Sequence, residues 1–216
     1  MGIRLQWPVV GGGDDEALIS ADRAQLVQSL HGKHYEDCLA GRVFSHVPTV
    51  LGLAIPIYTA TALAGGMPIW NPAGSGVNVE LISASTAYVS GTSAYGGVVL
   101  MHRAGLGTDL ATGSEITAFA ETTPDNGLLG AGNSSKVKSS NAGTTTVTAG
   151  VAGESVRTLF SLNLEAATGT AHQTSVAEVD FEGTVIVPPG SMVWLGCRVA
   201  SSALFTSGFV WKELAI

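Results

Sequence analysis

Hydrophobic and polar residues alternate along much of this chain after residue 48, which is the pattern of half-buried β-strands. The longest alternating stretch is residues 77–90. Its apolar side chains are expected on one face, and they are Val79, Leu81, Ala87 and Val89. The opposite face carries Thr86 and other polar residues, so we expect that face to meet solvent.

Further stretches of strand-like sequence follow, separated by Gly-, Pro- and Asn-rich turn signals. The predicted strands cover residues 97–103, 114–120, 135–139, 144–149, 156–165, 176–187, 192–200 and 209–214. Many short strands without helices between them indicate a sandwich or a barrel. Trp194 and Trp211 lie within apolar strands, so we expect both in the core.

A sharp corner is predicted where Val187 is followed by Pro188, Pro189 and Gly190. The two prolines cannot donate to a strand ladder, so one strand must end there and the next begins at once. This strand–corner–strand unit, followed by one last strand, resembles the closing half of a viral jelly roll. We therefore predict an all-β fold, a jelly-roll-like antiparallel β-sandwich with an N-terminal extended arm and a short helical segment.

The N-terminal residues show a different sequence pattern from the rest of the chain. Residues 1–13 form a predicted extended arm with Trp7 beside Pro8. A helix is expected to start at Asp14 or Asp15, to show part of an apolar stripe at Leu26, Val27 and Leu30, and to stop at Gly32. A second short helix is predicted over residues 33–39, ended by Gly41. The predicted division is an attachment segment at 1–47 and a β-sandwich body at 48–216.

The composition adds a constraint on the surface. Only 12% of residues are charged and 45% are hydrophobic, whereas about a quarter of residues are charged in an ordinary soluble domain. Such a chain is expected to hide part of its surface against copies of itself or neighbours, and we predict a homo-oligomer, most simply a trimer. The net charge of −7 and the scattered basic residues argue against direct nucleic-acid binding.

Two other classes are disfavoured by the residues. The stretch 43–79 has no Asp, Glu, Lys or Arg, but three prolines and several glycines interrupt it, so we do not expect a membrane helix. The first residues lack the apolar core of a signal peptide, so the protein is expected to stay in the cytoplasm where it is made. Cys38 and Cys197 are expected to be free thiols, although a single disulfide stays open.

Candidate chemistry is sparse. His31, His34 and Cys38 are the best candidate metal ligands, with His46 beyond, but paired-Cys zinc spacing is missing, and we expect no metal. Glu178, Asp180 and Glu182 alternate along one predicted strand and could serve a glycosidase or a calcium site, but a solvated outer face is the simpler interpretation. The chain lacks the nucleophile, phosphate-loop and dinucleotide motifs. We predict no enzyme activity and no cofactor.

Three segments, residues 30–44, 69–92 and 181–196, together resemble a family of tailed-bacteriophage virion proteins. The shared features are an LHGKHYE-like box, an NPAGSG turn before a strand and a PPG corner. The resemblance implies a particle component with a jelly-roll-like body. The expected function is a non-enzymatic virion structural protein, a capsid decoration or head-associated subunit assembled in the host bacterial cytoplasm.

In this interpretation the N-terminal segment attaches the subunit to the major capsid protein or another virion protein. The expected partner-binding residues are Trp7, Leu26, Leu30, His34 and Tyr35. The alternative is a receptor- or carbohydrate-binding module of a tail fibre or spike, with binding loops around Tyr95 or Asp125 and Asn126. A glycan-degrading enzyme that uses the row of three acids is the third hypothesis.

Overall fold

The computed structural model divides the chain into two compact units, residues 1–36 and residues 37–216. The structure describes residues 6–8, 14–16, 18–19, 25–26, 32–48, 52–60, 63, 66–91, 96–106, 116–117, 119, 121–130, 132–140, 146–147, 154–162 and 176–216. Most of these residues lie in antiparallel strands, so the prediction of an all-β fold is confirmed.

The first unit contains two short antiparallel pairs rather than the long helix that the sequence predicts. β1 (Gln6–Pro8) pairs with β2 (Asp14–Glu16), and β3 (Leu18–Ile19) pairs with β4 (Gln25–Leu26). The helical prediction from Asp14 onward is therefore wrong at the residues of β2, β3 and β4. An apolar stripe of three residues gives a helix little to pack, and a short helix without a tertiary partner is marginal in water.

The short helix predicted over residues 33–39 is present as α1 (Tyr35–Leu39). It ends in a Schellman motif, because the Gly41 amide donates to the Cys38 carbonyl and the Arg42 amide donates to the Asp37 carbonyl, each at 2.9 Å. Gly41 has a φ of 68°, in the left-handed region that favours glycine.

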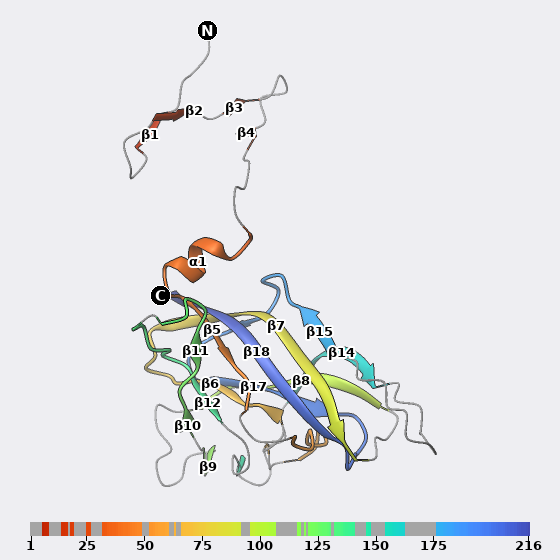
Figure 1. The fold of residues 1–216 in the computed structure, drawn as a ribbon. Helices are drawn as coiled ribbons and strands as arrows, with labels where there is room; N and C mark the ends of the chain where they lie inside the picture. The colour runs from red at the N-terminus through yellow and green to blue at the C-terminus, as the bar shows by residue number, and fades with distance from the viewer. Residues whose placement is uncertain are drawn as a thin grey trace. The chain divides into compact units, whose positions relative to one another are not determined.

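Two antiparallel sheets pack face to face in the second unit (Figure 1). One, here called the β18 sheet, has the order β11 (Asp125–Asn126), β5 (Val43–His46), β18 (Leu204–Ala215), β7 (Val77–Ser90), β15 (Val176–Asp180). The other, the β17 sheet, has the order β10 (Glu121–Thr122), β12 (Lys138–Ser140), β6 (Ile69–Asn71), β17 (Ser191–Cys197), β8 (Gly96–Arg103), β14 (Glu154–Leu162).

The strand order is that of a jelly roll. Without the strands of the connection between β8 and β14 and the two-residue strand Ile186–Val187, the chain order of the main strands of the body is β5, β6, β7, β8, β14, β15, β17, β18. The β18 sheet then contains the first, eighth, third and sixth of them, and the β17 sheet contains the second, seventh, fourth and fifth. Each sheet therefore pairs strands from both halves of the chain, as two interleaved Greek keys do. β10, β11 and β12 belong to the long connection between β8 and β14.

The boundary of the body lies earlier than the sequence predicts. β5 falls inside the predicted attachment segment 1–47, yet it pairs with β18 along its whole length. Phe44 of β5 stacks on Trp211 of β18, with ring centroids 6.3 Å apart. Residues 37–47 are therefore part of the body, and the two units separate between Glu36 and Asp37.

The body contains two separate hydrophobic clusters. The larger one fills the space between the sheets and includes Phe44, Leu81, Phe209 and Trp211. The second lies on the other side of the β17 sheet, where Trp70, Met101 and Trp194 meet residues from connecting segments. Those connecting residues are Leu63, Leu106 and Phe119. Both faces of β17 are thus covered and all seven of its residues are buried, which confirms the core positions of Trp194 and Trp211.

The alternation predicted for residues 77–90 holds only in part. Val79 and Leu81 are fully buried, but Thr86 is buried as well and Val89 is 42% exposed. The register of β7 against β18 shifts between the pairs Val210–Ser83 and Trp211–Leu81, so Ile82 is an extra residue on β7. A bulge of one residue inverts the faces of everything that follows it. The inward assignment of Ala87 and Val89 was therefore wrong.

The predicted PPG corner is present. The short strand β16 (Ile186–Val187), which pairs with β7, ends at Val187, and β17 begins at Ser191. Gly190 has a φ of 79° and its amide donates to the Asn71 carbonyl at 2.7 Å. The remaining pair, β9 (Ile116–Thr117) with β13 (Thr146–Val147), lies in the connection between β8 and β14. Within the described part of the chain, no helix is long and apolar enough to cross a bilayer.

Candidate interaction surfaces

A network of charges lies where the chain enters the body. Asp37 forms ion pairs with Arg42 at 2.7 Å and with Lys212 at 3.2 Å, and Lys212 also pairs with Glu80 at 3.0 Å. Burial acts to lower the pKa of Lys212, but its hydrogen bonds to Glu80 and Asp37 outweigh burial and raise it. The network therefore joins the start of the body to the C-terminal end of β18 and the N-terminal end of β7.

A second polar tie joins the last strand to the long β8–β14 connection. The Glu213 carboxylate is buried, and it accepts hydrogen bonds from the Ser135 hydroxyl and from the Lys136 amide, the latter at 3.1 Å to each oxygen. The Val137 amide at 3.4 Å and the Trp211 indole at 3.5 Å complete the set of donors. A carboxylate so well supplied with donors is a structural group rather than a candidate acid or base.

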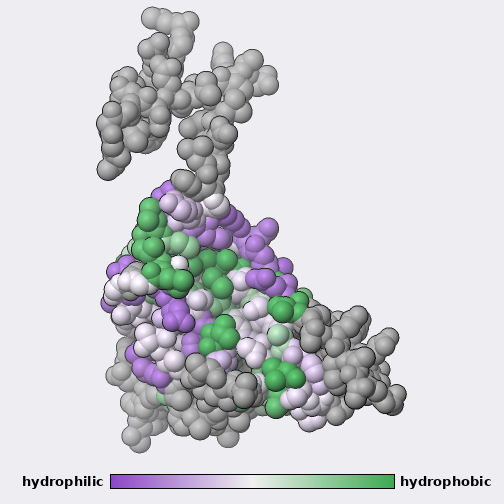
Figure 2. All heavy atoms as spheres, in the orientation of Figure 1, coloured by the Kyte–Doolittle hydropathy of each residue, from purple (hydrophilic) through white to green (hydrophobic). Residues whose placement is uncertain are grey.

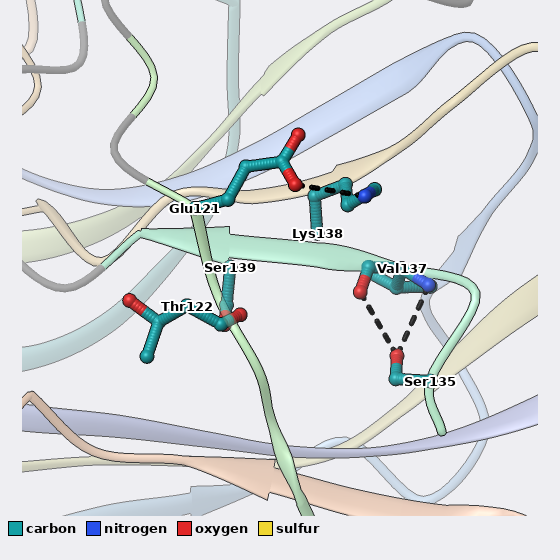
Figure 3. A network of polar contacts seen from close by, with 6 residues as sticks. All are labelled: Glu121, Thr122, Ser135, Val137, Lys138 and Ser139. Carbon is teal, nitrogen blue, oxygen red and sulfur yellow. Dashed lines mark hydrogen bonds and ion pairs between the residues drawn. The ribbon is translucent and has the colours of Figure 1, made fainter.

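Figure 3 shows how the same connection is held together. Lys138 of β12 forms an ion pair with Glu121 of β10 at 2.8 Å, and the Ser139 hydroxyl donates to the Thr122 carbonyl at 3.0 Å. The hydroxyl of Ser135 accepts from the Val137 amide at 3.0 Å. These contacts order the strand pair that extends the β17 sheet beyond β6.

A groove of about 500 Å³ opens beside these two ties. It lies between the residues that follow α1, the start of β7, the loop before β12 and the end of β18. Arg42, Lys136 and Glu213 are its charged lining residues. Glu213 is engaged by the loop and Arg42 by Asp37, so two of the three charged side chains that line the groove already have partners.

The predicted partner-binding residues fall in three places. Trp7 lies on β1 opposite Asp15, and Leu26 lies on β4 opposite Leu18. Leu30 is outside the described residues. His34 is half-buried, and its Nδ1 has no hydrogen-bond partner among the residues that the structure describes. The next residue, Tyr35, is 45% exposed. His34 and Tyr35 are therefore neighbours only because they are adjacent in the chain. The binding role of all five residues stays a prediction.

The candidate metal ligands do not form a site among the residues that the structure describes. His31 lies outside that set, and no group of three or more His, Cys, Asp or Glu residues within it could hold a metal ion. Cys38 is a half-buried free thiol, and Cys197 is a buried one. His46 points into the body instead, where it is only 3% exposed.

The predicted row of three acids contains only two members. Glu178 and Asp180 project outward from β15, opposite the half-buried Val179. Glu182 follows the strand in a turn with a φ of 48°, and its amide donates to the Asp180 carboxylate at 2.8 Å. The row therefore ends at Asp180, the last residue of β15, while Phe181 is buried as the alternation predicts. For Glu178 and Asp180 the solvated outer face is what the structure shows.

One uncovered surface was not anticipated from the sequence, namely the outer face of the β18 sheet. Its side chains form cross-strand rows of small and β-branched residues: Ser45, Val210 and Ser83; Gly208 and Ser85, with Val47 beside Gly208; Thr206 and Ala87. The rows end in acidic residues, because Asp180 and Glu178 of β15 pair with Ser83 and Ser85, and Asp125 of β11 pairs with Ser45. In Figure 2 the side of the molecule that bears β18 and β7 shows pale and green residues over its middle, with purple ones near α1 and at the margins. The alternating uncharged positions of residues 204–210 are the sequence signal for this face.

The residues of the alternative binding loops lie in different settings, and Asp125 is exposed on β11. Tyr95 is outside the described residues. Asn126 is buried, and its side chain donates to the Gly41 carbonyl at 3.0 Å and accepts from the Leu128 amide at 2.8 Å. Its amide is therefore used to hold β11 against the start of the body.

Comparisons with known proteins give no relative for this chain. No protein-family model, no curated protein sequence and no solved structure matches it significantly.

Proposed function

We propose that this chain is a non-enzymatic structural subunit of a tailed-bacteriophage particle, a capsid decoration or head-associated protein that assembles with copies of itself. The observation that carries the proposal is the jelly-roll strand order of the body, because this architecture is common among viral capsid domains. The resemblance of residues 30–44, 69–92 and 181–196 to virion proteins of tailed phages supports the same class.

The polar groups of the body support a structural role. Its buried carboxylate, Glu213, is engaged by backbone amides, and Asp37 and Glu80 are held by Lys212. These side chains join segments that lie far apart in the sequence. Such contacts stabilise the body, which is what a structural subunit requires.

The surface supports repeated contacts between subunits. Exposed apolar side chains are spread over the body, among them Val47, Leu129 and Val176. A chain with 12% charged residues has few charges with which to keep such side chains apart in solution. Packing against neighbours in a shell would remove them from water.

In this proposal the first unit supplies the attachment to the major capsid protein or another virion protein. An attachment segment must be ordered on binding, which costs conformational entropy. In an oligomer the second and third attachments become intramolecular, so several attachments together can offset this cost. An oligomer such as a trimer would therefore bind a particle much more tightly than one subunit.

A truncation tests this division of labour. Residues 1–36 are to be removed and β5 kept, because a cut at residue 47 would delete a strand of the body. We expect the chain 37–216 to fold, with the strand signal of the full chain in circular dichroism, and to fail to co-sediment with particles that lack this protein. The full chain should co-sediment with them.

The outcomes separate the alternatives. Full chain that stays in the supernatant would count against a virion role. Truncated chain that decorates particles as completely as the full chain would place the attachment surface on the body. Full chain with Glu178→Gln is the matched control, since that exposed side chain has no role in attachment here. A handful of bound copies per particle, in place of a repeated array, would favour the tail-fibre or spike alternative.

A further inference from the structure

We draw no further inference here: the strongest candidate, the exposed side chains of Leu39 on α1 and of Leu128 and Leu129 in the loop after β11, near the groove that Ala40 and Gly132 line, carries nothing, because nothing in the described part of the chain shows what covers them.

Discussion

The Glu213 carboxylate accepts a hydrogen bond from the Ser135 hydroxyl, across 78 residues of sequence. The contact joins the last strand of the jelly roll to the connection that carries β10, β11 and β12. Two backbone amides, those of Lys136 and Val137, point at the same carboxylate. The last strand and this connection should therefore lose stability together when the carboxylate is altered.

Glu213→Gln keeps the size of the side chain and removes its charge. We expect the free energy of unfolding to fall by about 1–3 kcal/mol, because buried amides lose a charged acceptor. Urea denaturation followed by tryptophan fluorescence measures the change. Glu178→Gln, at an exposed site, should stay within about 0.5 kcal/mol of the wild type. Equal effects of the two substitutions would contradict the structural role of Glu213.

Asn71 links the NPAGSG turn before β7 to the PPG corner before β17. Its side-chain amide donates to the Val77 carbonyl at 2.9 Å and to the Val187 carbonyl at 3.0 Å, and the residue is fully buried. Asn71→Asp would put a carboxylate against two carbonyl oxygens, and we expect a loss of about 3 kcal/mol or more. The half-buried Asn78→Asp is the control in the same thermal melts. A melting temperature unchanged in Asn71→Asp would refute this link.

His46 should make the body sensitive to acid. It is buried on β5, where desolvation lowers its pKa more than the hydrogen bond to the Ser140 backbone and the charge of Asp125 raise it. Its Nε2 has no partner among the described residues. The unfolded chain therefore binds a proton below pH 6.5 that the folded chain resists, and stability should decrease as the pH falls from that value.

Chemical denaturation at several pH values between about 7.5 and 5 measures this dependence. Burial also lowers the pKa of His102, which acts in the same direction. His46→Gln can still donate to the Ser140 carbonyl and does not titrate, so its free energy of unfolding should fall less steeply with acid than that of the wild type. Identical slopes in the two proteins would show that His46 contributes nothing.

The two cysteines should react differently in the folded protein. Burial raises the pKa of the Cys197 thiol to about 11, so little thiolate forms at neutral pH. Cys38 is only half-buried. We expect a thiol reagent to modify one cysteine in the native state and both in denaturant, and Cys38→Ser to abolish the native reaction. Rapid modification of Cys197 in folded protein would contradict its burial.

The parts of the fold that the sequence predicts best are those with strong local signals. The PPG corner before β17 and the helix end at Gly41 are both determined by residues that restrict the backbone over a few positions. The jelly-roll order could be anticipated only through resemblance, because strand order depends on contacts such as β5 with β18, more than 150 residues apart.

The failures have a common physical cause. The extra residue at Ile82 is invisible in the alternation of residues 77–90, yet it exchanges the inner and outer faces from there on. Likewise, three apolar residues in the first unit fit a helix as well as a strand, and pairing between segments decided the outcome. For the first of these reasons the sequence does not indicate which residues form the outer face of the β18 sheet, since simple alternation places Ala87 and Val89 inward.

The mass of the full chain in solution, measured by light scattering after size-exclusion chromatography, tests most directly whether this protein is a self-assembling building block. A single subunit has a mass of 22.0 kDa. We expect a stable species of at least twice that mass. A monodisperse 22.0 kDa particle at every concentration examined would contradict the account.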